Sequence, residues 1–182
     1  MKRKSDKIIM NDVWRIILTH MKEKEVRIKL RSTIYEVEAS LFSDDADLAL
    51  MSEEESGDPE PQDIEINTVG KKRFDNGRLE IFYDESEVTG MEGASTSISY
   101  DLADKGIITM LREGSVATAL VFEAGRRHHC LYKTPYMPFE VCVYTLTVDN
   151  RLEEDGELYL DYLVEIRGAK AERTKFEMKV IE

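Results

Sequence analysis

Long apolar segments, cysteine-rich patterns and the common catalytic motifs are all missing from this sequence of 182 residues. No stretch approaches the roughly 18 uninterrupted apolar residues of a membrane helix, because the best candidate, IIMNDVWRIIL, contains Asp12 and Arg15. The same charges, together with the missing small-residue cleavage site, argue against a secretion signal. We therefore expect a cytoplasmic protein.

Cysteine is scarce, since Cys130 and Cys142 are the only two in the sequence. Two cysteines do not make a disulfide framework, and we interpret them as reduced thiols. The run His128-His129-Cys130 contains good zinc ligands, and a turn at TPYMP would bring Cys142 near Cys130. Neighbouring strand residues point to opposite faces, and neither CxxC spacing nor a fourth ligand is present. We therefore predict no metal and no cofactor.

Recognisable catalytic and nucleotide-binding motifs are also missing. The sequence has no Ser-His-Asp set in a familiar context, no phosphate-binding glycine loop and no H-E-x-x-H motif. The spacing of Gly90 and Gly93 matches GxxG alone, which is a weak signal. The usual hydrolase and nucleotide-binding functions therefore lack support.

Charge is abundant but unevenly distributed, with a formal net charge of -12. Residues 1–31 carry ten Lys or Arg and four acids, whereas residues 43–63 carry nine acids and no base. Nucleic-acid affinity comes mostly from clustered cations, so the acidic body argues against a large nucleic-acid surface. The basic N-terminal arm, residues 2–31, leaves a weaker alternative in which the protein is a nucleoprotein adaptor.

We divide the chain into an N-terminal extension, residues 1–22, and one β-domain, residues 23–182. Residues 5–22 have a helical pattern, with Ser5 or Asp6 as a cap and an apolar stripe that includes Ile9 and Val13. A flexible extension is the alternative. The acidic stretch 43–63 has few bulky apolar residues, and we predict that it is a mobile insertion.

The rest of the sequence is typical of antiparallel strands. Residues 26–39 alternate apolar and polar side chains, and Asn76-Gly77 between two such runs is a strong hairpin signal. Further runs are expected at 64–74, 78–85, 94–102, 106–112, 115–123, 126–134, 139–148, 156–167 and 171–181. Their short connections favour a meander that curls into a barrel, because closure removes exposed sheet edges.

Several motifs resemble one protein family. The runs FYDESEVTGMEGASTSI, ITMLREG, LVFEAGRRHHCLYKTPYMPFEVCVYT and LDYLVEIRG are similar to the YwiB-like family of bacterial proteins. The resemblance extends from about Val26 to the C-terminus, apart from the acidic insertion. It implies a closed lipocalin-like, or calycin-like, antiparallel barrel of about eight strands. It implies no activity, because the function of that family is unknown.

One carboxylate is a candidate for an interior site. On a strand through Tyr83, Asp84 and Glu85, the side chains of Tyr83 and Glu85 share a face and can both enter the barrel. Glu85 could act there as an acid or base, with Glu87 as a substitute and Arg112 as the stabiliser of an anion. The alternative is that Glu85 only pairs with Arg112, while Gly90 and Gly93 bend the chain.

We expect a binder without catalytic activity, with a small molecule inside the barrel or a protein at its mouth. The enzyme based on Glu85 or Glu87 is the alternative. The polar lining predicts a polar or anionic ligand and argues against a fatty acid. The candidate ligand-binding residues are Tyr83, Glu85, Thr96, Arg112, Tyr132, Thr134 and Thr145.

Overall fold

The computed structural model describes residues 22–37, 61–167 and 171–182. The helix expected at residues 5–22 and the acidic insertion expected at residues 43–63 lie outside these ranges, apart from the last residues of each segment. Those last residues belong to the described part, where strands begin at Lys22 and Gln62. The strands are β1 Lys22–Val37, β2 Gln62–Asp75, β3 Arg78–Asp84, β4 Ala94–Asp101, β5 Asp104–Gly114, β6 Thr118–Glu123, β7 Arg127–Lys133, β8 Pro138–Arg151, β9 Glu157–Ile166 and β10 Ala171–Ile181. A short 3-10 helix, η1 Glu87–Thr89, follows β3.

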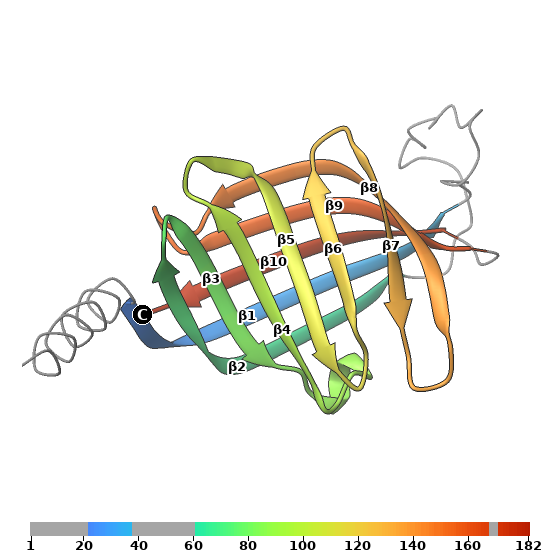
Figure 1. The fold of residues 1–182 in the computed structure, drawn as a ribbon, viewed down its shortest axis with the longest axis horizontal. Coiled ribbons are helices and arrows are strands. Elements are labelled where there is room, and N and C mark those ends of the chain that lie inside the picture. The colour runs from blue at the N-terminus through green and yellow to red at the C-terminus, as the bar shows by residue number, and fades with distance from the viewer. Residues whose placement is uncertain (1–21, 38–60, 168–170) are drawn as a thin grey trace, which may run out of the picture.

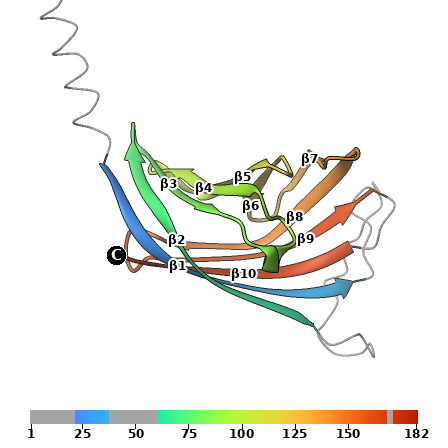
Figure 2. The ribbon, with the colours of Figure 1, turned by 90° about the horizontal axis from the view of Figure 1, so that it is seen from below.

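The ten strands form one antiparallel sheet in the order β6-β5-β4-β3-β2-β1-β10-β9-β8-β7. Consecutive strands are neighbours except for β6 and β7, and the first and last strands of the chain pair with each other. The sheet curls so that β3, β4 and β5 face β1, β10 and β9 (Figure 2). The predicted all-β class and sequential antiparallel pairing are confirmed.

The prediction of a closed barrel of about eight strands needs two corrections. The barrel has ten strands, which is the number of strand-like runs in the sequence itself. It is also only nearly closed, because β6 and β7 lie at the two ends of the strand order. Among the described residues, one isolated bridge, Ala117 to Lys133, joins their ends. We call this gap between β6 and β7 the seam.

The core lies inside the barrel because the strands alternate in side-chain direction. On β1 the inward residues Val26, Ile28 and Leu30 are buried, as the period of two in the sequence predicts. Each other strand contributes one face to the same cluster. Its most deeply buried members are Ile28, Leu79, Ile81, Ile98, Ile108, Met110, Phe122 and Leu160.

The predicted hairpin between β2 and β3 is confirmed. Asn76 and Gly77 have φ angles of 48° and 79°, which is the left-handed backbone that a two-residue type I′ turn requires. This turn sets the pairing of Asp75 with Arg78 and therefore directs Tyr83 inward.

In the part of the chain that the structure describes, no helix is long and apolar enough to cross a membrane.

Candidate functional site

A cavity of about 560 Å³ lies inside one end of the barrel. It is bordered by the β3–β4 loop, which contains η1, and by the start of the β7–β8 turn at Thr134. Figure 1 shows this loop and this turn on the same, lower side of the molecule. The volume falls in the range of small-molecule pockets, which is about 300–1,000 Å³. We call this space the mouth cavity.

Most of the wall of the mouth cavity is apolar. The apolar side chains come from β1, β2, β6, β8, β9 and β10 and from two loops, and they belong to the inward faces of those strands. They are Leu30, Ile34, Ile64, Ile66, Met91, Val116, Leu120, Val141, Val164, Ile166 and Phe176. The expectation that the lining could not hold apolar cargo is therefore wrong, because it considered the polar candidates alone.

A buried ion pair lies in this apolar wall. The Glu85 side chain is 2% exposed and the Arg112 side chain 17%, and 3.8 Å separates Glu85 Oε1 from Arg112 Nε. The expected pairing of Glu85 with Arg112 is thus confirmed. Thr96, fully buried on β4, donates its hydroxyl hydrogen to the same Glu85 oxygen. The backbone places the three together, since Thr96 is directly opposite Arg112 in the β4–β5 pairing.

Arg112 retains an unused hydrogen-bond donor. A separation of 3.8 Å is too long for a hydrogen bond. The Nε atom is shielded from solvent and has no hydrogen-bond partner among the described residues. A buried donor without an acceptor costs about 1–3 kcal/mol. A ligand acceptor can reach this N–H only when the side chains that cover it shift, and the hydrogen bond then formed would recover part of that cost.

Two buried tyrosines accompany the ion pair. Burial, followed by the nearby Glu85 carboxylate, raises the pKa of Tyr83 far above its ordinary value. Burial also raises the pKa of Tyr162, although the positive charge of Arg112 opposes this shift. Both tyrosines line the mouth cavity, and their hydroxyls stay protonated at neutral pH. Each can therefore donate or accept a hydrogen bond without adding charge.

The β3–β4 loop and the β7–β8 turn are fastened at the cavity border. Tyr132 on β7 points its hydroxyl at Met91 Sδ, 3.6 Å away in the β3–β4 loop. Thr134 Oγ1 accepts hydrogen bonds from the backbone N–H groups of Tyr136 and Met137 and donates to the Met137 carbonyl. Gly90 follows η1 with a φ of 69°, in accordance with the expected bend. Tyr132 and Thr134 thus have structural contacts in addition to lining the cavity.

Five of the seven predicted site residues line the mouth cavity, namely Tyr83, Glu85, Arg112, Tyr132 and Thr134. Thr96 is behind them and contacts Glu85. Thr145 is fully buried elsewhere, and its backbone N–H and carbonyl bind the β6–β7 turn at Arg126 and Gly125. Glu87, the alternative acid or base, is exposed on η1 and does not line the cavity.

The two cysteines lie near each other on paired strands, as expected, but their side chains point to opposite faces and so cannot share a site. Cys130 pairs with Val141, and it is His129 that faces Cys142, with 3.8 Å between Nε2 and Sγ. Cys130 packs on the main core, while Cys142 belongs to a second cluster on the other face. Within the described ranges, no three His, Cys, Asp or Glu residues are arranged to hold a metal ion.

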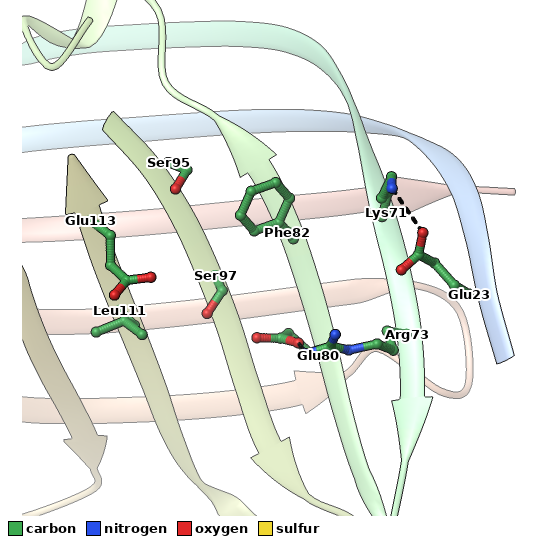
Figure 3. Close-up of a pocket in the computed structure, with 9 residues that line it drawn as sticks. All are labelled: Glu23, Lys71, Arg73, Glu80, Phe82, Ser95, Ser97, Leu111 and Glu113. Atoms are coloured by element: carbon green, nitrogen blue, oxygen red, sulfur yellow. Dashed lines mark hydrogen bonds and ion pairs between the residues drawn. The ribbon is translucent and has the colours of Figure 1, made fainter. Parts of the chain in front are cut away.

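A second hollow, of about 350 Å³, lies on the outer face of strands β2 to β5 (Figure 3). Four of its five charged residues are paired with each other, because Lys71 contacts Glu23 at 2.8 Å and Arg73 contacts Glu80. Small serines of β4 lie between Phe82 and the side chains of β5. None of the predicted site residues belongs to this surface, so the mouth cavity is the stronger candidate site.

The apolar half of the site and five of its polar members, among them Tyr162 and Thr174, were not predicted from the sequence. Tyr162 and Thr174 line the mouth cavity from β9 and β10. Both lie at inward positions of alternating strands, so the period of two could have identified them as interior residues. The apolar wall had no distinct signal, because cavity-lining and core-filling side chains have the same pattern in a sequence.

Comparison with known proteins identifies the family. The model of the DUF1934 family, described as a domain of unknown function, matches residues 49–178. The chain belongs to the DUF1934 family. No curated protein matches it. In shape, this DUF1934 chain is similar to the crystal structure of the YwiB protein from Bacillus subtilis, with a TM-score of 0.61 and 16% sequence identity.

The superposition covers 89% of the DUF1934 chain and 96% of the Bacillus protein. The predicted resemblance to the YwiB-like family is therefore confirmed. At this level of identity the likeness concerns the fold alone. The function of the mouth cavity has to be argued from its own geometry.

Proposed function

We propose that the protein binds a small molecule in the mouth cavity and that this binding, without chemical conversion, is its function. The observation that supports this is the combination of an apolar wall with the buried Glu85–Arg112 pair, which has an unused donor at Arg112 Nε. Ligand sites are typically apolar clefts in which a few polar groups fix the orientation. The ligand then has an apolar part and a polar group near Arg112.

The catalytic alternative has less support. Glu85 Oε1 already accepts the Thr96 hydroxyl hydrogen and lies against Arg112, so this oxygen is engaged. Glu87 is exposed on η1. The adaptor alternative depends on the N-terminal arm, most of which lies outside the described residues. We retain the cytoplasm as the proposed location, where both cysteines would stay free thiols.

Filling the cavity tests the proposal. Ser32 on β1 lines the mouth cavity, and Thr33 is the next residue, on the opposite face. Ser32→Phe places a ring in the cavity, and Thr33→Phe adds the same ring to the outer surface. We expect the neutral fluorescent probe N-phenyl-1-naphthylamine to bind the wild type and Thr33→Phe at one molecule per chain.

The Ser32→Phe variant should bind the probe at least about tenfold more weakly, which corresponds to about 1.4 kcal/mol. Circular dichroism and thermal unfolding would establish that both variants are folded. Equal affinity in the two variants, or no binding to the wild type, would reject binding in the mouth cavity.

A further inference from the structure

The charges that face the mouth cavity limit what its occupant can carry. Among the described lining residues, the charged ones are Glu85, Arg112 and Glu172. Glu85 and Arg112 neutralise each other across 3.8 Å, while Glu172 is exposed at the border. Two carboxylates and one guanidinium leave one net negative charge around the cavity. The whole chain has a net charge of -12, so the long-range field has the same sign.

An anionic head group is disfavoured in this setting. A carboxylate next to Arg112 would also lie next to the buried Glu85 carboxylate, and like charges repel strongly where water is scarce. Arg112 cannot neutralise both anions. A cationic head group meets the opposite difficulty, because at Glu85 it would lie next to the Arg112 guanidinium, and two positive charges repel each other there as well.

A neutral head group can supply the hydrogen-bond acceptor that Arg112 lacks. Arg112 Nε–H is shielded from solvent and is without an acceptor in the described part of the chain. Tyr83 and Tyr162 line the same cavity, and a tyrosine hydroxyl can hydrogen-bond a neutral polar group. A carbonyl oxygen accepts from several such donors and brings no net charge.

The remainder of the cavity suits a hydrocarbon or ring. Leu30, Ile66, Val164 and Phe176 come from four different strands and line the space together. Burial of apolar surface is favourable by about 25 cal/mol per Å². The apolar wall can therefore supply affinity while Arg112 sets the orientation of the head group.

We propose that the occupant is a neutral amphipathic molecule, with an apolar chain or ring and a carbonyl head group, such as an amide, ester or ketone, that accepts a hydrogen bond from Arg112 Nε–H. This inference depends on the proposed function, since it names the ligand class of the same cavity. It replaces the anionic alternative of the sequence analysis with a neutral one.

Three ligands with one chain and different head groups test the inference. Calorimetry on the full chain at neutral pH would compare octanamide, octanoate and octylammonium. We expect octanamide to bind at least about tenfold more tightly than either charged ligand. In a nitrogen–proton NMR spectrum, the side-chain Nε–H resonance of Arg112 should shift with octanamide.

A double variant provides the control for the head group. Glu85→Gln combined with Arg112→Met removes both charges together and leaves no buried charge unpaired. The variant should still bind the octyl chain, and the preference among the three head groups should fall below about twofold. A single Arg112→Lys variant, which keeps the charge but lacks the Nε–H donor, should lose most of the octanamide preference.

The outcomes separate this inference from the proposed function. Octanoate or octylammonium binding as tightly as octanamide would overturn the neutral class and leave cavity binding in place. The neutral class would also be overturned if none of the three ligands bound. Cavity binding would stay in place if N-phenyl-1-naphthylamine still bound the wild type and Ser32→Phe abolished that binding. Unchanged head-group preference in the double variant would also overturn the role of Arg112.

Discussion

Glu85 and Arg112 are the residues on which the site depends, because each makes the burial of the other tolerable. Their charges lie 3.8 Å apart in an apolar wall, and the Glu85 side chain is almost completely shielded. Taking one charge out of water is expensive unless a partner remains. The pair is therefore expected to contribute to stability as a unit.

A double-mutant cycle measures this coupling. Glu85→Gln leaves Arg112 without a counter-charge, and we expect it to lower the free energy of unfolding by about 3 kcal/mol. Arg112→Met should cost a similar amount, and the double variant at least about 1 kcal/mol less than the sum. Urea unfolding of the four proteins gives these values. Additive losses would show that the two residues act independently.

The buried tyrosines predict the response of stability to alkali. Burial and the nearby Glu153 carboxylate raise the pKa of Tyr100 to about 12, and the pKa values of Tyr83 and Tyr162 are also raised. The unfolded chain ionises near the ordinary value of 10.0 and so releases these protons first. Stability from the protonated hydroxyls is complete below pH 10 and is lost as the pH rises towards 12.

Tyrosinate absorbance tests this prediction. In the folded protein, part of the signal of the eight tyrosines should be missing at pH 11 and should appear on unfolding in urea. Tyr83→Phe should lower the absorbance that appears only on unfolding by the contribution of one tyrosine. A folded titration that matches the unfolded one would contradict the burial of these hydroxyls.

At the scale of the strand, β6 and β7 form the weakest part of the barrel wall. Side chains cross the seam where a backbone ladder would be expected. Thr118 Oγ1 lies 3.7 Å from Cys130 Sγ, and His128 Nε2 lies 3.4 Å from Glu123 Oε2. Each of these strands pairs along its length with one neighbour, whereas β1 is paired with both β2 and β10.

Hydrogen exchange should show this difference between the strands. We expect amide protons of β6 and β7 that face the seam to exchange at least about tenfold faster than those in the middle of β1, because fewer hydrogen bonds must open. Mass spectrometry of peptic peptides from each strand provides the measurement. Equal protection of β1 and β6 would mean that the barrel is closed in solution.

Alternation of apolar and polar residues predicted the strands well, because the buried residues of β1 and β3 recur at every second position, as the sequence pattern indicates. Register was harder. The turn brings Cys142 near Cys130, as expected, but the two are offset by one position, and an offset of one puts the side chains on opposite faces. The turn from Thr134 to Met137 sets that register through hydrogen bonds of Thr134, which a pattern does not contain.

The strand count and the seam illustrate a second limit of the sequence. The runs in the sequence numbered ten, and the resemblance to a family led to the smaller count. Whether β6 and β7 pair along their length depends on how far the sheet curls. The backbone bonds of the β6–β7 turn go to Thr145 on β8, which is distant in sequence and was predicted to line a ligand site.

For the whole molecule, the two ends of the barrel differ. The end opposite the mouth cavity is filled, because Leu152 from the β8–β9 turn is 1% exposed and joins the core cluster. Lys105 of β5 holds this end by contacting Glu153 at 2.6 Å and Glu154 at 2.9 Å. A ligand is therefore expected to enter at the end with the β3–β4 loop and the β7–β8 turn.

Native mass spectrometry of the protein, purified gently from its own host, would show whether the mouth cavity carries a small molecule. We expect the 21.0 kDa chain with one bound small molecule for the wild type and for Thr33→Phe. We expect the bare chain for Ser32→Phe, in which the ring occupies the mouth cavity. A wild type without a bound molecule, a retained protein in place of one, or the same molecule on Ser32→Phe would contradict the proposed binding.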